Sequence, residues 1–303
     1  MYLAHRTVGH NHTIFLIFCH FRVTFPAYFY IYYFRESPFY RISYGYPHTD
    51  IFVKGTYYLR FPQNTYRLQM NLYPSAPATI KHRSTVVAYC DAPVESEFDY
   101  TATKNGYITL NQKRLIETAA PMSVSFYDSK GKKITDVVSD HEIATKIMFP
   151  VKKGESYKIR EKTLSVDGQQ FYQMNLTFTA LNEKSGSNKG NAVNIKLKKH
   201  TLGMIYTQDS IKKTDWYKFT NSKNRKIKFT YAGGVTSGSI NVSIYNSKGK
   251  KMGTYYLMPT KGDPVTYKLT NVNKSQTIAK GTYYVKVTKS RKETAGVYDL
   301  KFY

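Results

Sequence analysis

The chain has few residues suited to covalent cross-linking or to metal binding through sulfur. It holds two cysteines, Cys19 and Cys90, and a single tryptophan in 303 residues. Two cysteines are too few for a disulfide framework or for a cysteine-based metal site. Long apolar runs at helical spacing are also missing, whereas 29 tyrosines and 17 phenylalanines favour strands. The composition therefore indicates a β-rich protein without a disulfide framework.

Acidic residues are scarce as well, with 20 Asp and Glu against 45 Lys and Arg, a formal net charge of +25. From Asn182 to the end there are 24 basic and 6 acidic residues. Such a surface attracts polyanions, among them nucleic acid, anionic cell-wall polymers, sulfated glycans and membrane headgroups. The alternative is a solvated, lysine-rich surface that keeps the protein soluble.

Motifs of catalysis and of nucleotide binding are missing from the sequence. There is no Gly-x-Ser-x-Gly elbow, and Gly233-Gly234 lacks the Lys-Ser/Thr ending of a phosphate-binding loop. The eight histidines are scattered, four of them within the first 20 residues. No aromatic RNA-recognition signature is present. We therefore expect neither an enzyme nor a specific nucleic-acid-binding protein.

Residues 1–50 form an atypical N-terminal segment. Thr13 to Phe34 is apolar and aromatic, but His20, Arg22 and Pro26 interrupt it, and a membrane-spanning helix needs about 20 apolar residues. No small-x-small cleavage site follows its apolar stretch. Three interpretations stay open: an extension unrelated to the rest, a degenerate signal or membrane anchor, and strands of a damaged first repeat.

A glycine turn followed by an alternating strand occurs three times. It reads Val-Lys-Gly-Thr-Tyr-Tyr-Leu-Arg-Phe at 53–61, Val-Lys-Lys-Gly-Glu-Ser-Tyr-Lys-Ile at 151–159 and Ala-Lys-Gly-Thr-Tyr-Tyr-Val-Lys-Val at 279–287. A lysine-rich turn is also repeated, at 128–133 and 246–251. Such self-similarity indicates an internal repeat.

The repeats divide the chain into short strands with turn signals between them, which is typical of a β-sandwich of about 100 residues. We therefore expect an all-β protein of tandem jelly-roll-like β-sandwiches behind a non-homologous aromatic N-terminal segment. The expected divisions are the segment 1–50, a truncated first repeat that keeps its last two strands at 51–74, and sandwich repeats at 84–181 and 192–303.

The third repeat resembles a known family. Its Asp215-Trp216-Tyr217-x-Phe219, the strand ending Ser-Ile-Tyr-Asn-Ser-Lys-Gly-Lys at 243–250, Lys-Gly-Thr-Tyr-Tyr-Val-Lys-Val at 280–287 and Gly-Val-Tyr-Asp-Leu at 296–300 resemble the bacterial pre-peptidase C-terminal domain. That family includes the collagen-binding domains of secreted clostridial collagenases. The resemblance covers the third repeat well, the second fairly and the first only at its tail. It implies jelly-roll-like sandwiches in a secreted or cell-surface bacterial protein, although the sequence shows no attached catalytic domain and no clean signal peptide.

One acidic cluster lies near the start of the second repeat, formed by Asp91, Glu95, Glu97 and Asp99. Converging carboxylates are the hard oxygen ligands that Ca²⁺ takes, and the resemblance implies calcium binding near this place. The alternative is a solvated loop that balances nearby lysines.

Exposed tyrosines beside lysine turns are the candidate ligand contacts. Two adjacent tyrosines in a strand point to opposite faces, so one of each pair is expected to be exposed. The candidate residues are Tyr255, Tyr256, Lys248, Lys250 and Lys251. The recurrence of such pairs also fits a role in maintaining the fold. Trp216, at the second position of its strand, is expected in the core.

The resulting hypothesis is a non-catalytic extracellular binding or adhesion module. Its partner would be a collagen-like polymer, a glycan or an anionic cell-wall polymer, or it would assist a secreted enzyme. The alternative is a structural spacer of a bacterial surface protein that has no ligand of its own. Apart from possible calcium, no cofactor is expected.

Overall fold

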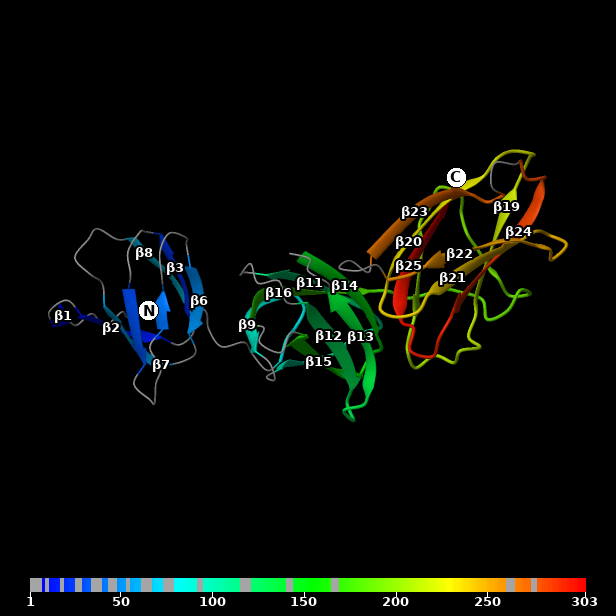
Figure 1. The fold of residues 1–303 in the computed structure, drawn as a ribbon. Helices are drawn as coiled ribbons and strands as arrows, with labels where there is room; N and C mark the ends of the chain where they lie inside the picture. The colour runs from blue at the N-terminus through cyan, green and yellow to red at the C-terminus, as the bar shows by residue number, and fades with distance from the viewer. Residues whose placement is uncertain are drawn as a thin grey trace. The chain divides into compact units, whose positions relative to one another are not determined.

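The computed structural model of the chain is built from β-strands joined by turns and loops (Figure 1). It describes residues 79–303 apart from 92–94, 115–120, 140–143, 165–168, 260–264 and 274–276; side chains at 89–91, 138–139, 144–145, 169–171 and 265–267 also lie outside the description, and within 1–78 it covers the strands alone. No helix occurs among these described residues, so the expected all-β fold is confirmed. None of the described residues therefore belongs to a helix that could cross a membrane. The chain divides into two compact units, Met1–Ala76 and Pro77–Tyr303.

The first unit contains eight described strands. They are β1 (Thr7–Val8), β2 (Asn11–Leu16), β3 (Cys19–Thr24), β4 (Phe29–Tyr33), β5 (Tyr40–Ile42), β6 (His48–Phe52), β7 (Gly55–Arg60) and β8 (Arg67–Leu72). One sheet has the order β1-β2-β7-β4-β5 and the other the order β6-β3-β8. The structure thus differs from the expected division at residue 50, because β2 and β4 from the N-terminal segment pair with the two sides of β7. The first repeat is not reduced to its last two strands.

The second repeat forms two four-stranded antiparallel sheets. Its strands are β9 (Ser84–Asp91), β10 (Ser96–Thr101), β11 (Gly106–Arg114), β12 (Met122–Asp128), β13 (Lys133–Ser139), β14 (Ala144–Val151), β15 (Ser156–Thr163) and β16 (Gln169–Ala180). The sheet orders are β10-β15-β12-β13 and β14-β11-β16-β9.

The third repeat follows the same plan. Its strands are β17 (Val193–Asn194), β18 (Thr201–Ile205), β19 (Asp215–Asn221), β20 (Lys228–Val235), β21 (Ile240–Tyr245), β22 (Lys251–Leu257), β23 (Val265–Asn271), β24 (Gly281–Lys289) and β25 (Gly296–Phe302). The sheet orders are β17-β19-β24-β21-β22 and β18-β25-β20-β23. Apart from the short parallel pair β17 and β19, these strands pair antiparallel.

The three repeats share one strand order. In each of them the glycine-turn strand, β7, β15 or β24, lies between two partners in the middle of its sheet. The strand that follows it, β8, β16 or β25, pairs in the opposite sheet with β3, β11 or β20 respectively. The repeated sequence motif therefore marks an interior strand of one sheet. The strand that follows it along the chain belongs to the other sheet.

Each described sandwich has its own aromatic core. In the second repeat, Phe126 stacks on Phe149 with ring centroids 4.1 Å apart. In the third, Phe302 lies between Phe219 and Phe229, at 4.6 and 5.1 Å. These rings are at most 1% exposed, and burying each stabilises the fold by about 1.5–3 kcal/mol. Alternation along the strands brings the rings together, because every second side chain points inward.

The second and third repeats pack against each other within the second unit (Figure 1). Met148 of β14 lies against Gly234 of β20, where a Cβ atom would be 2.7 Å from the Met148 Cβ. The Thr135 hydroxyl donates to the Thr236 hydroxyl over 3.1 Å, and Lys152 forms an ion pair of 3.6 Å with Asp209. Apolar packing and polar contacts thus join the two sandwiches.

Candidate functional site: an aromatic and basic sheet face

The side chains of β19 alternate between the core and the outer face of the third sandwich. Asp215, Tyr217 and Phe219 are buried, whereas Trp216 and Lys218 are half-buried on the opposite face. The expectation that Trp216 lies in the core is wrong, because Tyr217 and Phe219 set the inward phase of the strand. The polar Lys218 and Thr220, which share the phase of Trp216, are the sequence signal that could have shown this.

The outer face of this sheet is assembled from four adjacent strands. Strand register aligns Trp216 of β19 with Lys286 of β24, and Lys286 with Ser243 of β21. A second row of neighbouring residues aligns Lys218, Tyr284 and Tyr245 across the same three strands. A third row pairs Tyr256 of β22 with Asn241. We call this surface the Trp216 face, and it comprises Trp216, Lys218, Asn241, Ser243, Tyr245, Thr254, Tyr256, Tyr284 and Lys286.

Two aromatic rings meet on this face across an intervening strand. The Trp216 and Tyr245 ring centroids are 5.7 Å apart, with their planes inclined by 35°. Their strands, β19 and β21, are both neighbours of β24 and hence roughly 9.5 Å apart. The side chains therefore reach toward each other above β24 and form a continuous aromatic surface there.

Ammonium groups lie against the same rings. Lys286 Nζ is 5.6 Å from the centroid of the Trp216 ring, and Lys189 Nζ is 4.7 Å from that of Tyr284. Both distances are within the range of cation–π attraction. The lysines are thus held next to the aromatic surface.

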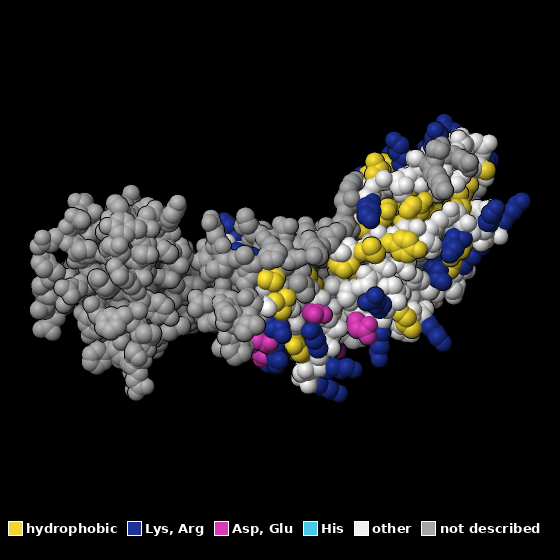
Figure 2. Space-filling view, in the orientation of Figure 1, with side chains coloured by type: hydrophobic (Ala, Val, Ile, Leu, Met, Phe, Trp, Pro, Cys, Tyr) yellow, Lys and Arg dark blue, Asp and Glu magenta, His cyan; other side chains and the backbone are white. Residues whose placement is uncertain are grey.

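No carboxylate shares the Trp216 face. Among the residues of β17, β19, β21, β22 and β24, Asp215 is the one acidic residue, and it faces the core with 1% exposure. Figure 2 shows Lys and Arg side chains spread over the visible surface of the third repeat, where Asp and Glu are few. The face therefore has a positive, unbalanced charge.

The tyrosines predicted as ligand contacts have different roles. Tyr255 is half-buried against the core, and its hydroxyl donates to the carbonyls of Asn271 and Val272 at 3.0 and 3.3 Å. Tyr256 is 50% exposed and points outward. Tyr255 therefore maintains the fold, whereas Tyr256 is available to a ligand.

The predicted lysines Lys248, Lys250 and Lys251 lie exposed at the turn between β21 and β22. The Asn246 side-chain oxygen accepts a hydrogen bond from the backbone amide of Lys250 over 2.9 Å. Gly249 adopts a φ of 80°, which a residue without Cβ reaches at no steric cost. The same turn recurs at Asp128 and Gly131. The repeated sequence motif thus encodes a rigid turn that presents lysines to solvent, at the opposite end of the hairpin from Tyr256.

Of the acidic residues predicted to bind calcium, the three with described side chains, Glu95, Glu97 and Asp99, lie beside basic residues. Glu97 and Asp99 lie on the outward phase of β10 and pair with Lys158 of β15, and Glu97 also accepts from Arg160 over 2.6 Å. Glu95 is 3.9 Å from Lys162. The side chain of Asp91 lies outside the described residues, and no group of three His, Cys, Asp or Glu side chains suited to a metal ion occurs among those described. Calcium binding stays a prediction.

These ion pairs alter the titration of Glu97. Hydrogen bonds from Lys158 and then Arg160 lower the pKa of Glu97 below its usual value. The equivalent face of the second repeat thus carries matched charges, unlike the Trp216 face.

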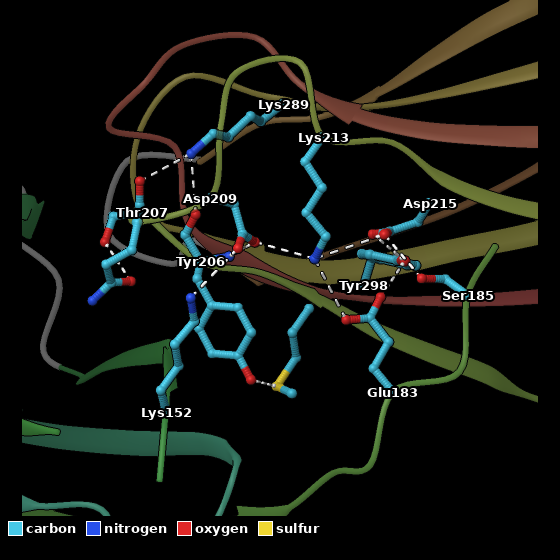
Figure 3. A network of polar contacts seen from close by, with 12 residues as sticks. Lys152, Glu183, Ser185, Tyr206, Thr207, Asp209, Lys213, Asp215, Lys289 and Tyr298 are labelled. Carbon is cyan, nitrogen blue, oxygen red and sulfur yellow. Dashed lines mark hydrogen bonds and ion pairs between the residues drawn. The ribbon is translucent and has the colours of Figure 1, made fainter. Parts of the chain in front are cut away.

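A buried polar cluster ties the connecting segment to the third sandwich (Figure 3). The Tyr298 hydroxyl lies 2.9 Å from Asp215 Oδ2, 3.1 Å from Glu183 Oε1 and 2.8 Å from the Tyr217 hydroxyl. The Ser185 hydroxyl donates to Asp215 over 2.9 Å. Because Glu183 and Ser185 precede the third repeat, the cluster fixes the path of the connection.

The ammonium of Lys213 lies among the carboxylates of this cluster. Its Nζ lies 3.1 Å from Asp209, 3.7 Å from Asp215 and 3.9 Å from Glu183. Burial, and secondly the charge of Asp215, raise the pKa of Glu183 to about 7. Burial opposes the charge on Lys213, but the three carboxylates raise the pKa of Lys213 overall. Since Tyr298 and Asp215 are at most 1% exposed, the cluster has the character of a structural clamp and not of a substrate site.

Comparison with known proteins leaves the family of this chain open. No family model and no curated protein matches the sequence. Among solved structures, the chain is similar to tripeptidyl peptidase 2 (TM-score 0.28, 9% identity) over 98% of its own length but only 32% of that chain. It is also similar to a triple jelly-roll protein of an archaeal virus turret (0.22, 10%; 98% and 82% covered) and to the tandem CBM22 domains of Paenibacillus barcinonensis Xyn10C (0.21, 11%; 80% and 88% covered). At these low scores and identities the similarities assign this chain neither a family nor a function.

Proposed function

We propose that the protein is a non-catalytic extracellular binding module that holds an extended polymer on the Trp216 face. The observation that carries the proposal is the aromatic surface of Trp216 and Tyr245, bordered by lysines and free of carboxylates. Aromatic side chains supply large, flat contact areas with few rotatable bonds to immobilise. An open sheet face suits a long ligand that runs past it.

The location outside the cell is part of the proposal. It is supported by the resemblance of residues 215–300 to the pre-peptidase C-terminal domain, whose members accompany secreted enzymes and surface proteins. Assistance to a secreted enzyme follows from the same resemblance. The formal charge of +25 also favours a polyanionic surface as the environment of the protein.

A structural spacer is the second candidate function. It is favoured by the packing of Met148 on Gly234 and by the ion pair of Lys152 with Asp209, which hold two repeats together as one unit. A spacer needs such stiffness and needs no ligand. The two functions differ in whether the Trp216 face binds anything.

The experiment that tests the proposal is a binding assay on the full chain. Collagen, a neutral polysaccharide and an anionic cell-wall polymer are immobilised, and saturable binding is measured for the wild type, Trp216→Ala and Tyr245→Ala. Tyr127→Ala is the matched control, because Tyr127 occupies the same place before the lysine turn of the second repeat and lies under Arg160 at 4.4 Å.

The proposal expects at least one polymer to bind, with affinity lost in the Trp216 and Tyr245 variants and kept in the Tyr127 variant. No binding to any polymer would favour the spacer. Equal binding by all variants would mean that another surface holds the polymer and would overturn the assignment to the Trp216 face.

A further inference from the structure

Lys218 and Lys286 lie on the Trp216 face, and Lys189 lies beside it at Tyr284. Among the described residues, no carboxylate forms an ion pair with Lys189, Lys218 or Lys286. Lys286 and Lys189 instead lie over the rings of Trp216 and Tyr284. A neutral ligand lying on these rings would leave the ammonium groups without a counter-charge, whereas an anionic ligand would pair with them.

The aromatic side chains of the face favour ligands that contain sugar rings. The ring planes of Trp216 and Tyr245 are inclined to each other by only 35°, so the two rings form a shallow surface. A sugar ring can lay its apolar C–H side on such a surface. A polyanion without rings, such as polyphosphate, gains only the charge contacts. The two features together fit a ligand that carries both a flat ring and a negative charge in each repeating unit.

The second repeat provides an internal comparison. Its equivalent sheet face carries Glu97 and Asp99 against Lys158 and Arg160, so its cations are already paired. Of the described side chains that point outward from β12 and β15, Tyr127 is the aromatic one, and Arg160 covers its ring. The same architecture therefore has a compensated face in one repeat and an uncompensated, aromatic face in the other.

We propose that the Trp216 face binds a linear acidic polysaccharide whose sugar rings carry carboxylate or sulfate groups. The inference rests on the proposed function and names the class of polymer. The aromatic surface orients the sugar rings, and Lys218 and Lys286, which lie in adjacent rows of the face, bind the acidic substituents.

The test uses the full chain and two matched pairs of probes, with affinity measured at several salt concentrations. Polygalacturonate is compared with its methyl ester, and dextran sulfate with dextran, so that each pair differs in charge but keeps its sugar ring. The first pair detects carboxylate recognition and the second sulfate recognition. Polyphosphate serves as a charged probe without sugar.

The inference expects binding to polygalacturonate, dextran sulfate or both, with weaker binding to the neutral partner and to polyphosphate. Lys286→Gln should reduce the slope of log affinity against log salt by about one, because one fewer counterion is released. Trp216→Ala should weaken binding about tenfold at every salt concentration without changing that slope. Tyr245→Leu repeats the test if Trp216→Ala does not fold, and Tyr127→Ala should bind as the wild type does.

Each alternative result has a defined meaning. Equal binding to the charged and neutral member of a pair, with loss in Trp216→Ala, overturns the inference and leaves the proposed function standing. Polyphosphate binding equal to that of the acidic glycans, unaffected by Trp216→Ala, overturns it because charge alone would then explain binding. Failure of both acidic glycans also overturns it, and binding of collagen in the earlier assay would still support the proposed function.

Discussion

Trp216 and Tyr245 lie on strands that are not neighbours, yet their rings approach to 5.7 Å above the strand between them. This contact makes the outer face of the third sandwich aromatic. It also partly covers the only tryptophan of the chain, whose indole Nε1 donates to the Thr214 hydroxyl over 3.1 Å. The tryptophan is thus an intrinsic spectroscopic probe of the face.

Removing the Tyr245 ring should expose Trp216. We predict that Tyr245→Ala shifts the emission of Trp216 to longer wavelength and increases its quenching by acrylamide, because the neighbouring ring no longer excludes water. Tyr127→Ala, in the second repeat, should leave both quantities unchanged. An identical spectrum in the Tyr245 variant would show that the two rings are not in contact.

Lys213 should be essential to the buried cluster. We predict that Lys213→Met lowers the free energy of unfolding by about 1–3 kcal/mol at pH 8, because Asp215 and Asp209 lose their shared, partly buried ammonium. The loss should be smaller at pH 5, where Glu183, whose pKa is raised to about 7, carries a proton. Urea unfolding at both pH values measures this.

Lys212→Met is the matched control for that experiment. It removes the same charge one residue earlier, at an exposed position, and should change stability by less than about 0.5 kcal/mol. Equal effects of the two variants would contradict the clamp assigned to Lys213.

Glu161 should make the protein less stable as pH rises. It is fully buried in the second repeat, accepts a hydrogen bond from Gln112, and burial raises its pKa from 4.5 to about 7. Between these two values the folded state binds more protons than the unfolded state, so this contribution to the free energy of unfolding falls as pH rises from about 4.5 to about 7. Glu161→Gln should therefore stabilise the protein by about 2–3 kcal/mol at pH 8 and have little effect at pH 4.5.

The pH dependence of the midpoint of thermal unfolding checks this prediction. Glu155→Gln, an exposed substitution on a turn of the same repeat, should follow the wild-type curve. A Glu161 variant that is less stable than the wild type at pH 8 would mean that the ionised carboxylate is well solvated or paired.

The contact between the two sandwiches should be sensitive to one added carbon atom. We predict that Gly234→Ala lowers the free energy of unfolding by about 1–3 kcal/mol, because its Cβ would lie 2.7 Å from the Cβ of Met148. Gly253→Ala, whose closest approach is 3.2 Å to the end of the Tyr255 side chain, should cost less. Denaturant unfolding compares the two, and a neutral Gly234→Ala would contradict the packing of β14 on β20.

The sequence predicted the class of fold because turn and strand signals are local. The motif at 279–287 identified β24 by its glycine turn and its alternating side chains, and β25 followed from the alternation of Tyr298, Leu300 and Phe302. The sequence leaves strands as only one of three interpretations of the N-terminal segment, because the strands between Thr7 and Ile42 share no such motif with the later copies. Their assignment depends on pairing with β7 and β8, which is not a local property.

The candidate site was less predictable because it depends on register. Glu97 and Lys158 are 61 residues apart and become partners only when β10 aligns with β15. Likewise, the phase of β19 decides whether Trp216 or Tyr217 is buried, and the aromatic character of both residues concealed the answer. Trp216 and Tyr245 come together across β24, a relationship that neither residue's local sequence contains.

The most direct test of the central claim is a titration of the full chain with polygalacturonate and dextran sulfate while the fluorescence of Trp216 is recorded. If the polymer binds on the Trp216 face, the emission changes saturably, acrylamide quenching falls, and Tyr127→Ala behaves as the wild type. If the polymer binds, as shown by co-sedimentation, but leaves the emission and quenching of Trp216 unchanged, another surface binds it and the claim is contradicted.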